Sequence, residues 1–479
     1  MTNQYPQILT SNIDGEWIAR GHRNVREVIN PNTGKSLGEL VEVDVADLDR
    51  ALEAADKGYR AWRATPIDQR TAILKKAADL LRGRVEEIAT ILAMEQGKPV
   101  EQAKGEVLAG IRFFDILPEE AKRAYGRTLV RPTGQMTTVT YEPVGPCLGL
   151  APWNFPFYNV ARKVAPALSA GCSIISKPAE ETPASAILLQ QALMEAGVPA
   201  NVSQMVFGDP DLVSRHCIAS PVIRKISFTG STPVGKHLMK LAADGMKRTT
   251  MELGGHAPVL VFDDCDLEKT LNLVVPAKFR NSGQVCVSPT RFYVQEGIYD
   301  RFVKAFTEFT DKNIKVGNAV DPTVKMGPLA NDRRLPAVGS LIEDAIKAGA
   351  RATTGAEAMD GDGYFYKPTV LADVPDSARI MNEEPFGPVA MMRPFKTMEE
   401  AIEQANRLPY GLAAYMFTEN LHTAMTASQL IESGMVGVNA VTMSTGDAPF
   451  GGVKESGHGL EDGPEGLKAF MVSKTTHFQ

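Results

Sequence analysis

Two glycine-containing segments each carry one residue that can do chemistry. Met-Glu-Leu-Gly-Gly-His (251–256) contains the carboxylate of Glu252, and Gly-Gln-Val-Cys (283–286) contains the thiol of Cys286. The glycines allow the backbone and a ligand to approach closely. A thiol can form a covalent intermediate, and a carboxylate whose pKa is raised by burial can activate the water that removes it. The pair therefore indicates nucleophilic catalysis followed by hydrolysis.

The other cysteines differ from Cys286 because they lie in apolar surroundings and are expected to be buried core residues: Cys147, Cys172, Cys217 and Cys265. The total of five is odd, the spacing is wide, and no Cys-x-x-Cys is present. These features argue against a disulfide framework and against a zinc site, so we expect no metal.

Length and composition indicate an ordinary globular protein. The chain has 479 residues, of which 44% are hydrophobic and 23% charged, which favours two or three domains. Its net charge of −6 comes without a long basic run, so nucleic acid and anionic membranes are not the expected partners. The first residues lack the pattern of a signal peptide, and no stretch is long enough for a transmembrane helix. We expect a cytoplasmic protein.

From residue 144 to about 250, short apolar runs alternate with helical segments, and this rhythm predicts a parallel sheet that binds ligands at the carboxyl ends of its strands. The predicted strands are 147–151, 173–176, 202–207 and 223–228. A second series follows from 256 to about 430, with strands near 258–262, 291–295, 388–392 and 434–438. Two α/β domains with Glu252 and Cys286 at their junction follow from this order.

Residues 124–143 have a different pattern. Alternating β-branched residues, interrupted by Thr133-Gly134, predict a hairpin with long arms. On pattern alone it is either part of an interface or a local two-stranded flap.

Two strand ends suit a dinucleotide. Phe228–Gly235 follows an apolar strand and opens a helix, so backbone N–H groups near Gly230 and Ser231 could bind a pyrophosphate; a plain strand–helix turn is the alternative. The usual Gly-x-Gly-x-x-Gly fingerprint is absent. Lys177 and Glu180 follow another strand, where a carboxylate can hold ribose hydroxyls and repel the 2′-phosphate of NADP. Otherwise they form a solvated loop pair.

Two further segments carry polar groups. In Pro-Trp-Asn-Phe-Pro (152–156), the amide of Asn154 can donate to an oxyanion, and Trp153 either walls a pocket or anchors the packing. Asn382–Pro388, which contains Glu384 and Phe386, is in isolation only an acidic loop.

In their order and spacing, these motifs resemble those of the NAD(P)-dependent aldehyde dehydrogenase superfamily, from Asp-Gly-Glu-Trp (14–17) to Pro-Phe-Gly-Gly-Val-Lys (449–454). The resemblance implies that Cys286 is the nucleophile, Glu252 the general base, and Asn154 with the backbone N–H of Cys286 the oxyanion hole. It also implies NAD as the cofactor, with NADP as the alternative. The implied cofactor residues are Trp153, Lys177, Glu180, Gly230, Ser231, Leu253, Glu384 and Phe386.

The same resemblance implies an α/β fold with two Rossmann-like parallel-sheet domains and a hairpin arm. Residues 1–123 and 144–252 would form the cofactor domain, and 253–464 the catalytic domain. Residues 124–143 and 465–479 would form an oligomerisation arm, which decides the hairpin in favour of an interface. The expected assembly is a homo-oligomer, a dimer of dimers.

Arg162 and Arg280 narrow the choice of aldehyde substrate. Paired arginines at these positions resemble succinate-semialdehyde dehydrogenases, and a guanidinium matches a carboxylate in shape and charge. The alternative is that one or both pair with a structural acid. Ser444, Thr445 and Phe450 are the other expected substrate contacts.

Two departures from the succinate-semialdehyde dehydrogenase pattern favour a related substrate. No second cysteine follows Cys286 two residues later, and the tail 456–467 departs from the usual Gly-Arg-Glu-Gly pattern. Both features look more like α-ketoglutaric semialdehyde dehydrogenases, so the length of the semialdehyde stays open.

Rival functions are a catalytically silent relative, a coenzyme A-acylating dehydrogenase, a plain thiol hydrolase and a dehydrogenase for non-anionic aldehydes. The presence of Cys286, Glu252 and Asn154 argues against the first. Glu252 argues against the second, and the cofactor motifs argue against the third.

Overall fold

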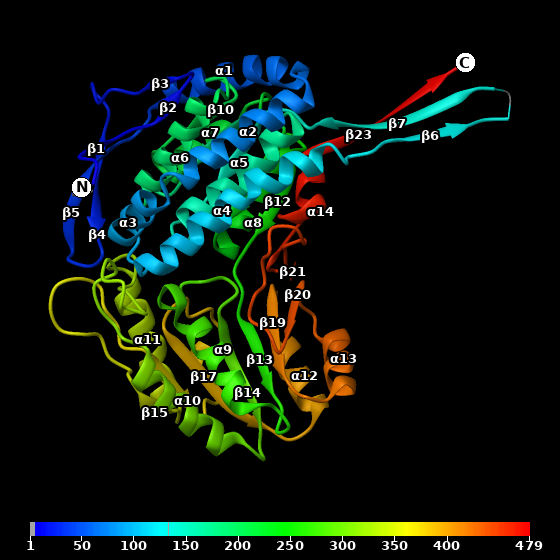
Figure 1. The fold of residues 1–479 in the computed structure, drawn as a ribbon. Helices are drawn as coiled ribbons and strands as arrows, with labels where there is room; N and C mark the ends of the chain where they lie inside the picture. The colour runs from blue at the N-terminus through cyan, green and yellow to red at the C-terminus, as the bar shows by residue number, and fades with distance from the viewer. Residues whose placement is uncertain (1–4, 133) are drawn as a thin grey trace.

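The computed structural model describes residues 5–132 and 134–479, which form two α/β bodies and a projecting arm (Figure 1). The first body is built on an eight-stranded sheet in which the run from β12 to β10 is parallel. In spatial order its strands are β22 (Gly457–His458), β12 (Arg248–Glu252), β11 (Lys225–Thr229), β8 (Cys147–Leu150), β9 (Ile174–Lys177), β10 (Ser203–Met205), β2 (Asn12–Ile13) and β3 (Glu16–Trp17).

Helices cover this sheet, and its central strands β8, β9 and β11 are buried throughout. Strands buried on both faces are typical of parallel sheets with crossover helices. The helices of this body are α1 (Val45–Ala64), α2 (Ile67–Arg82), α3 (Val85–Glu95), α4 (Val100–Ala121), α5 (Pro156–Ala170), α6 (Pro183–Ala196), α7 (Pro210–Ala219), α8 (Thr232–Asp244) and α14 (Gly463–Lys468). A small sheet of β1 (Ile8–Leu9), β5 (Lys35–Val41) and β4 (Val25–Asn30) lies at its side.

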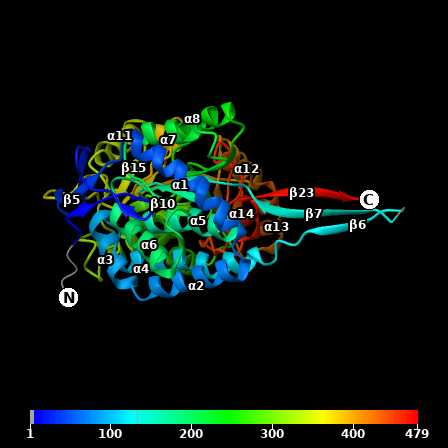
Figure 2. The ribbon, with the colours of Figure 1, turned by 90° about the horizontal axis from the view of Figure 1, so that it is seen from above.

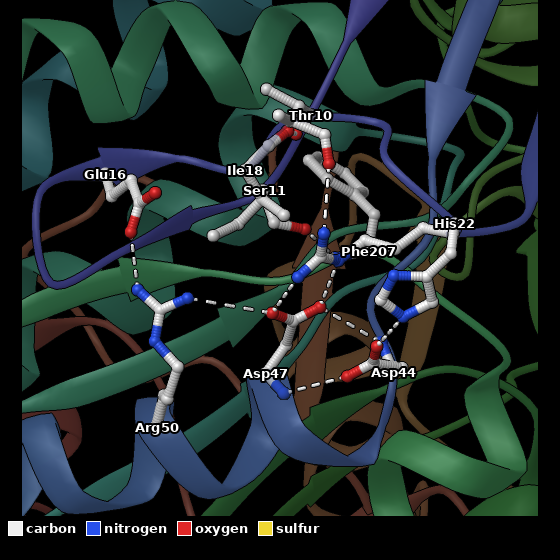
Figure 3. A network of polar contacts seen from close by, with 11 residues as sticks. Thr10, Ser11, Glu16, Ile18, His22, Asp44, Asp47, Arg50 and Phe207 are labelled. Carbon is white, nitrogen blue, oxygen red and sulfur yellow. Dashed lines mark hydrogen bonds and ion pairs between the residues drawn. The ribbon is translucent and has the colours of Figure 1, made fainter.

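A polar network fixes the N-terminal segment to the start of α1 (Figure 3). Asp44 and Asp47 form a capping box, in which each side chain accepts from the backbone N–H of the other. The buried Asp47 carboxylate also accepts two bonds from Arg23, at 2.6 and 2.7 Å. This bidentate pair holds the loop before β4 against the helix.

The second body contains a seven-stranded sheet, parallel except for its edge strand β15. Its order is β15 (Arg351–Thr354), β16 (Thr369–Ala372), β17 (Val389–Phe395), β14 (Pro289–Gln295), β13 (Ala257–Val261), β19 (Ala413–Phe417) and β20 (Met435–Val438). Around it lie α9 (Leu267–Phe279), α10 (Tyr299–Asn313), α11 (Arg334–Lys347), α12 (Met398–Asn406), α13 (Leu421–Leu430), the 3₁₀ turns Arg280–Gly283 and Arg379–Met381, and the strand pair β18 (Tyr410–Gly411) and β21 (Val453–Lys454).

The chain passes directly from one sheet to the other between β12 and β13. Glu252 is the last residue of β12, and Cys286 lies shortly before β14, the neighbour of β13. The carboxyl end of the first sheet therefore faces the amino end of the second. One segment crosses back: β22, which lies inside the predicted range 253–464, pairs with β12 in the first sheet.

The arm is a three-stranded antiparallel sheet of β6 (Arg127–Val130), β7 (Met136–Pro143) and β23 (Met471–Phe478). It extends well beyond the body in both views (Figures 1 and 2). The predicted hairpin is confirmed, and the C-terminal strand adds to it; Thr133 of the predicted turn lies outside the described residues. All four residues of β6 are exposed.

The fold class predicted from the sequence is confirmed, with two parallel-sheet α/β bodies and a hairpin arm. Within the described residues, no helix is both long and apolar enough to span a membrane.

Candidate active site

A cavity of about 910 Å³ lies where the two bodies meet. Thirteen of the sixteen residues expected at the site line it: Trp153, Asn154, Arg162, Gly230, Ser231, Glu252, Leu253, Arg280, Cys286, Glu384, Phe386, Ser444 and Phe450. Three do not. Thr445 lines a smaller adjoining cavity that shares Tyr158 and Ser444 with the first. Lys177 and Glu180 lie at the end of β9, next to β8.

The loop that carries Cys286 has an unusual backbone. Asn281, Ser282 and Gly283 have φ of 50°, 55° and 72°, three consecutive left-handed residues. Such a run is costly for residues with a Cβ, so the surroundings must hold it. Gln284, fully buried, does so: its Oε1 accepts from the Ala330 N–H at 3.0 Å and its Nε2 donates to Asn281 O at 3.1 Å.

Asn154 is fixed beside this loop. Its Nδ2 donates to Gln284 O at 3.2 Å, and Asn281 Nδ2 donates to Asn154 O at 2.8 Å. One amide hydrogen of Asn154 is used in this way, which leaves the other for a ligand.

Burial dominates the electrostatics of Glu252. It raises the pKa of this carboxyl well above its ordinary value, and the neighbouring Glu461 carboxylate adds to the rise. Arg162 and Lys163 act in the opposite direction. Oε1 of Glu252 is buried and has no hydrogen-bond partner among the described residues.

The Cys286 thiol is also shifted towards its neutral form. Burial raises its pKa to about 12, and the charges of Glu252 and Glu384 add to this. Cys286 is half-buried, whereas the other four cysteines are buried, as the sequence predicted, and all five are free.

The two strand-end motifs expected to bind a dinucleotide follow β11 and β9, which lie on either side of β8 in the first sheet. Ser231 is the N-cap of α8 but its side chain makes no capping bond, so the first backbone N–H groups of the helix remain available to an anion. Glu384 accepts from the Gly255 N–H at 3.1 Å, and Phe386 packs edge-on against Trp153 with ring centroids 5.5 Å apart. Lys177 forms a buried ion pair with Glu180. Free N–H groups at a helix start, carboxylates and an aromatic pair are kinds of groups that can bind a dinucleotide.

The two arginines have different surroundings. The Arg162 guanidinium is buried, lies 2.8 Å from an Asp462 oxygen and stacks 4.1 Å from the centroid of the Phe450 ring. Arg280 is exposed in the cavity wall, 5.5 Å from the Phe155 ring centroid, and has no ion pair among the described residues. The sequence predicted the same role for both arginines, a contact with the anionic end of the substrate.

Three residues that line the cavity, Lys98, Glu106 and Tyr158, were not predicted from the sequence. Lys98 donates to Asn154 O at 2.7 Å and pairs with the buried Glu106, whose other oxygen accepts from the Phe157 N–H at 3.0 Å. Tyr158 lies one helical turn before Arg162 and could have been found from this spacing. No group of three or more metal-ligating side chains occurs in the part of the chain that the structure describes.

The model of the Aldehyde dehydrogenase family matches residues 17–476, so the chain belongs to this family of aldehyde-oxidising oxidoreductases. Among curated relatives, it is 44% identical to 4-(hydroxymethyl)benzenesulfonate dehydrogenase TsaD1 of Comamonas testosteroni, over 99% of this chain and 98% of the relative. It is 38% identical to succinate-semialdehyde dehydrogenase [NADP(+)] GabD of Escherichia coli K12, over 96% of each. The crystal structure of succinate-semialdehyde dehydrogenase from Burkholderia pseudomallei superposes with a TM-score of 0.97 at 39% identity, over 100% of this chain and 99% of that one.

The raised pKa of Cys286 predicts how its alkylation depends on pH. Only the thiolate reacts, so the rate of modification by iodoacetamide should rise about tenfold per pH unit between pH 6 and 9. Glu252→Gln removes a charge that raises the thiol pKa, so it should speed the reaction. Mass spectrometry locates the label, with Cys286→Ala as the control. A rate that is flat across this range would contradict the assignment.

Proposed function

We propose that this enzyme oxidises an aldehyde with a distal anionic group to the corresponding acid, with NAD as the cofactor and NADP as the alternative. The favoured substrates are carboxylate-bearing semialdehydes: succinate semialdehyde, or α-ketoglutaric or glutaric semialdehyde. The observation that carries the proposal is the Arg280 guanidinium, which is exposed in the wall of the Cys286 cavity and forms no ion pair with any residue that the structure describes. A cation so placed attracts a negatively charged substrate and orients its aldehyde end.

Two relatives named above support an anionic substrate, since one bears the name of a carboxylate semialdehyde and the other that of a benzenesulfonate. An aromatic aldehyde with a sulfonate group is therefore the second candidate. A non-anionic aldehyde is the remaining alternative, but such a substrate would not explain why a cation, Arg280, lines the cavity.

In the first step, the Cys286 thiol releases its proton to solvent, the resulting thiolate forms a bond to the aldehyde carbon, and the π electrons of the carbonyl move to its oxygen. The free amide hydrogen of Asn154 and the backbone N–H of Cys286 donate to this oxyanion. Bound NAD(P) supplies a hydride acceptor. Loss of hydride from carbon to that acceptor, as the oxyanion re-forms its double bond, would leave a thioester on Cys286.

In the second step, Glu252 takes a proton from water while the water oxygen attacks the thioester carbon. Sulfur leaves as the Cys286 thiolate, and the acid is released. The raised pKa of Glu252 makes it a stronger base than an ordinary carboxylate, and it can act only above that pKa.

For cofactor binding, we propose that Gly230 and Ser231 hold the pyrophosphate and that Lys177 and Glu180 hold the adenosine ribose. Glu384 would hold the nicotinamide ribose, while Trp153, Leu253 and Phe386 would line its site. The ion pair with Lys177 compensates the Glu180 charge, so Glu180 repels a 2′-phosphate less than a free carboxylate would. This is why NADP stays as the alternative.

We further propose a cytoplasmic homo-oligomer, a dimer of dimers, assembled through the arm. The arm exposes apolar side chains, among them Val130 at 85% exposure and Phe478 at 47%, and an exposed strand edge. Both features are typical of surfaces that pair with another chain. The proposed division into a cofactor domain (1–123, 144–252), a catalytic domain (253–464) and this arm follows the sequence prediction.

The covalent step predicts the behaviour of Cys286→Ala. Without the sulfur no thioester forms, so NADH production at 340 nm should fall by at least about 10⁴-fold. Cofactor binding, followed by quenching of tryptophan fluorescence, should persist. Cys265→Ala, a change away from the cavity, is the control. Retained turnover in Cys286→Ala would end this mechanism.

The anion site predicts substrate preference. Wild type should have a kcat/KM for succinic, glutaric or α-ketoglutaric semialdehyde at least about a hundredfold above that for butanal, some 2.7 kcal/mol. Arg280→Gln should remove most of this advantage, while Arg301→Gln on the exposed face of α10 should not. Equal losses on charged and neutral aldehydes would count against the site.

The arm predicts an effect on assembly. Val130→Lys places a charge in the proposed interface and should lower the molar mass measured by light scattering at micromolar concentration. Leu421→Lys, at another strongly exposed position (74%) on α13, is the matched control. An unchanged mass for Val130→Lys, or a monomeric wild type, would contradict the proposed assembly.

A further inference from the structure

Asp462 is a buried acid with an unusual set of contacts. Its side chain is 0% exposed, and its Oδ2 accepts from Arg162 at 2.8 Å and from the Ser444 hydroxyl at 2.7 Å. Its Oδ1 is buried without a hydrogen-bond partner among the described residues. The same Arg162 nitrogen also donates to the Tyr158 hydroxyl at 2.7 Å. This Arg162 nitrogen lies beside Tyr158 and Ser444, which line the cavity. Asp462 therefore occupies a hydrogen-bond donor that a ligand in the cavity could otherwise use.

The backbone of Asp462 is strained. Its φ of 58° and ψ of 166° lie in a region that is almost restricted to glycine. A side chain at this position costs conformational energy, and glycine would fit without it. The strain indicates that the carboxylate is kept for its contacts and not for the turn.

Charges on the two sides of the cavity are therefore unequal. Arg162 is compensated by Asp462, with Glu461 at 3.6 Å as a second acid, whereas Arg280 has no internal counter-charge among the described residues. A bound anion gains little from a guanidinium that is already neutralised, and much from one that is not.

We propose that Asp462 determines substrate specificity as a built-in counter-anion that occupies Arg162 and leaves Arg280 to bind the distal anion of the substrate. The assignment rests on the proposed function, and it limits the preferred class to aldehydes with a single distal negative charge. Removal of the Asp462 charge opens a second anion contact at Arg162, Tyr158 and Ser444.

Asp462 also belongs to the buried cluster around Glu252. Burial raises the pKa of Glu252, and Asp462 contributes to the rise after Glu461. A change at position 462 thus alters water activation as well. That effect is the same for every thioester, so it cancels in the ratio of kcat/KM between a charged and a neutral aldehyde.

The test measures this ratio for succinate semialdehyde over butanal. Asp462→Asn keeps the acceptor oxygen and removes the charge, and Asp462→Gly also suits the backbone, so both should fold. Each should raise the ratio about tenfold, because an extra hydrogen bond to a charged group becomes available. Adding Arg162→Gln to Asp462→Asn should return the ratio to within about threefold of wild type. Asp14→Gly, another positive-φ aspartate at the exposed β2–β3 turn, is the matched control and should change nothing.

The outcomes separate the two proposals. If wild type prefers the anion, Arg280→Gln removes the preference and folded Asp462→Asn leaves the ratio unchanged or lower, then Asp462 has a structural role only and this inference is overturned alone. If wild type shows no preference for the anion, the proposed function fails and this inference fails with it. A rise with Asp462→Asn that survives the addition of Arg162→Gln would also overturn it, since the gain would not come from Arg162.

Discussion

The close approach of the Leu253–His256 crossing to the Cys286 loop is the constraint on which the rest of the site depends. A Cβ on Gly255 would lie 2.5 Å from the carbonyl oxygen of Cys286, and one on Gly254 would lie 2.7 Å from a carboxylate oxygen of Glu384. Only glycines allow this contact. The crossing joins Glu252, the last residue of β12, to the start of β13. It therefore fixes the position of Glu252 relative to the second sheet. The Cys286 thiol and the carboxylates of Glu252 and Glu384 are brought together by this close backbone approach.

Once the groups are assembled, the low polarity of the interior controls their protonation. The buried acids Glu252, Glu461 and Asp462 lie near the buried cations Arg162, Lys163 and Lys225. Burial raises the pKa of Asp462 and raises that of Glu252, whose carboxylate has the fewest contacts, well above its ordinary value. Glu461 instead has its pKa lowered, with the Lys163 and Arg162 charges overcoming its burial. Glu252 and Glu461 thus have pKa values shifted in opposite directions within the same buried environment.

The sequence predicts those parts of the structure that depend on local pattern. The apolar run 147–151 becomes β8, which is buried throughout, whereas 223–228 becomes β11, in which Ile226 and Phe228 alternate with buried polar residues. The hairpin follows from alternation, and Cys286 and Glu252 stand out through their glycines. Contacts between distant segments are not visible in this way. Arg162 and Asp462 are 300 residues apart, and Lys98 reaches Asn154 across 56, so neither partner could be named in advance. For the same reason the sequence left open which of Arg162 and Arg280 pairs with an internal acid, and the structure shows this pairing for Arg162.

Strand β22 gives the C-terminal segment a second attachment besides the arm. It pairs with β12 opposite Met251 and Glu252, and the Leu253 N–H donates to Ser456 O at 3.0 Å. A few residues later the same chain forms α14 and then β23, the edge strand of the projecting sheet. A short segment therefore links an edge strand of the projecting arm to the backbone beside Glu252. The C-terminal segment is thus held in two places, by β12 in the first sheet and by β7 in the arm, so a change in how β23 is paired acts on a chain that is also hydrogen-bonded next to Glu252.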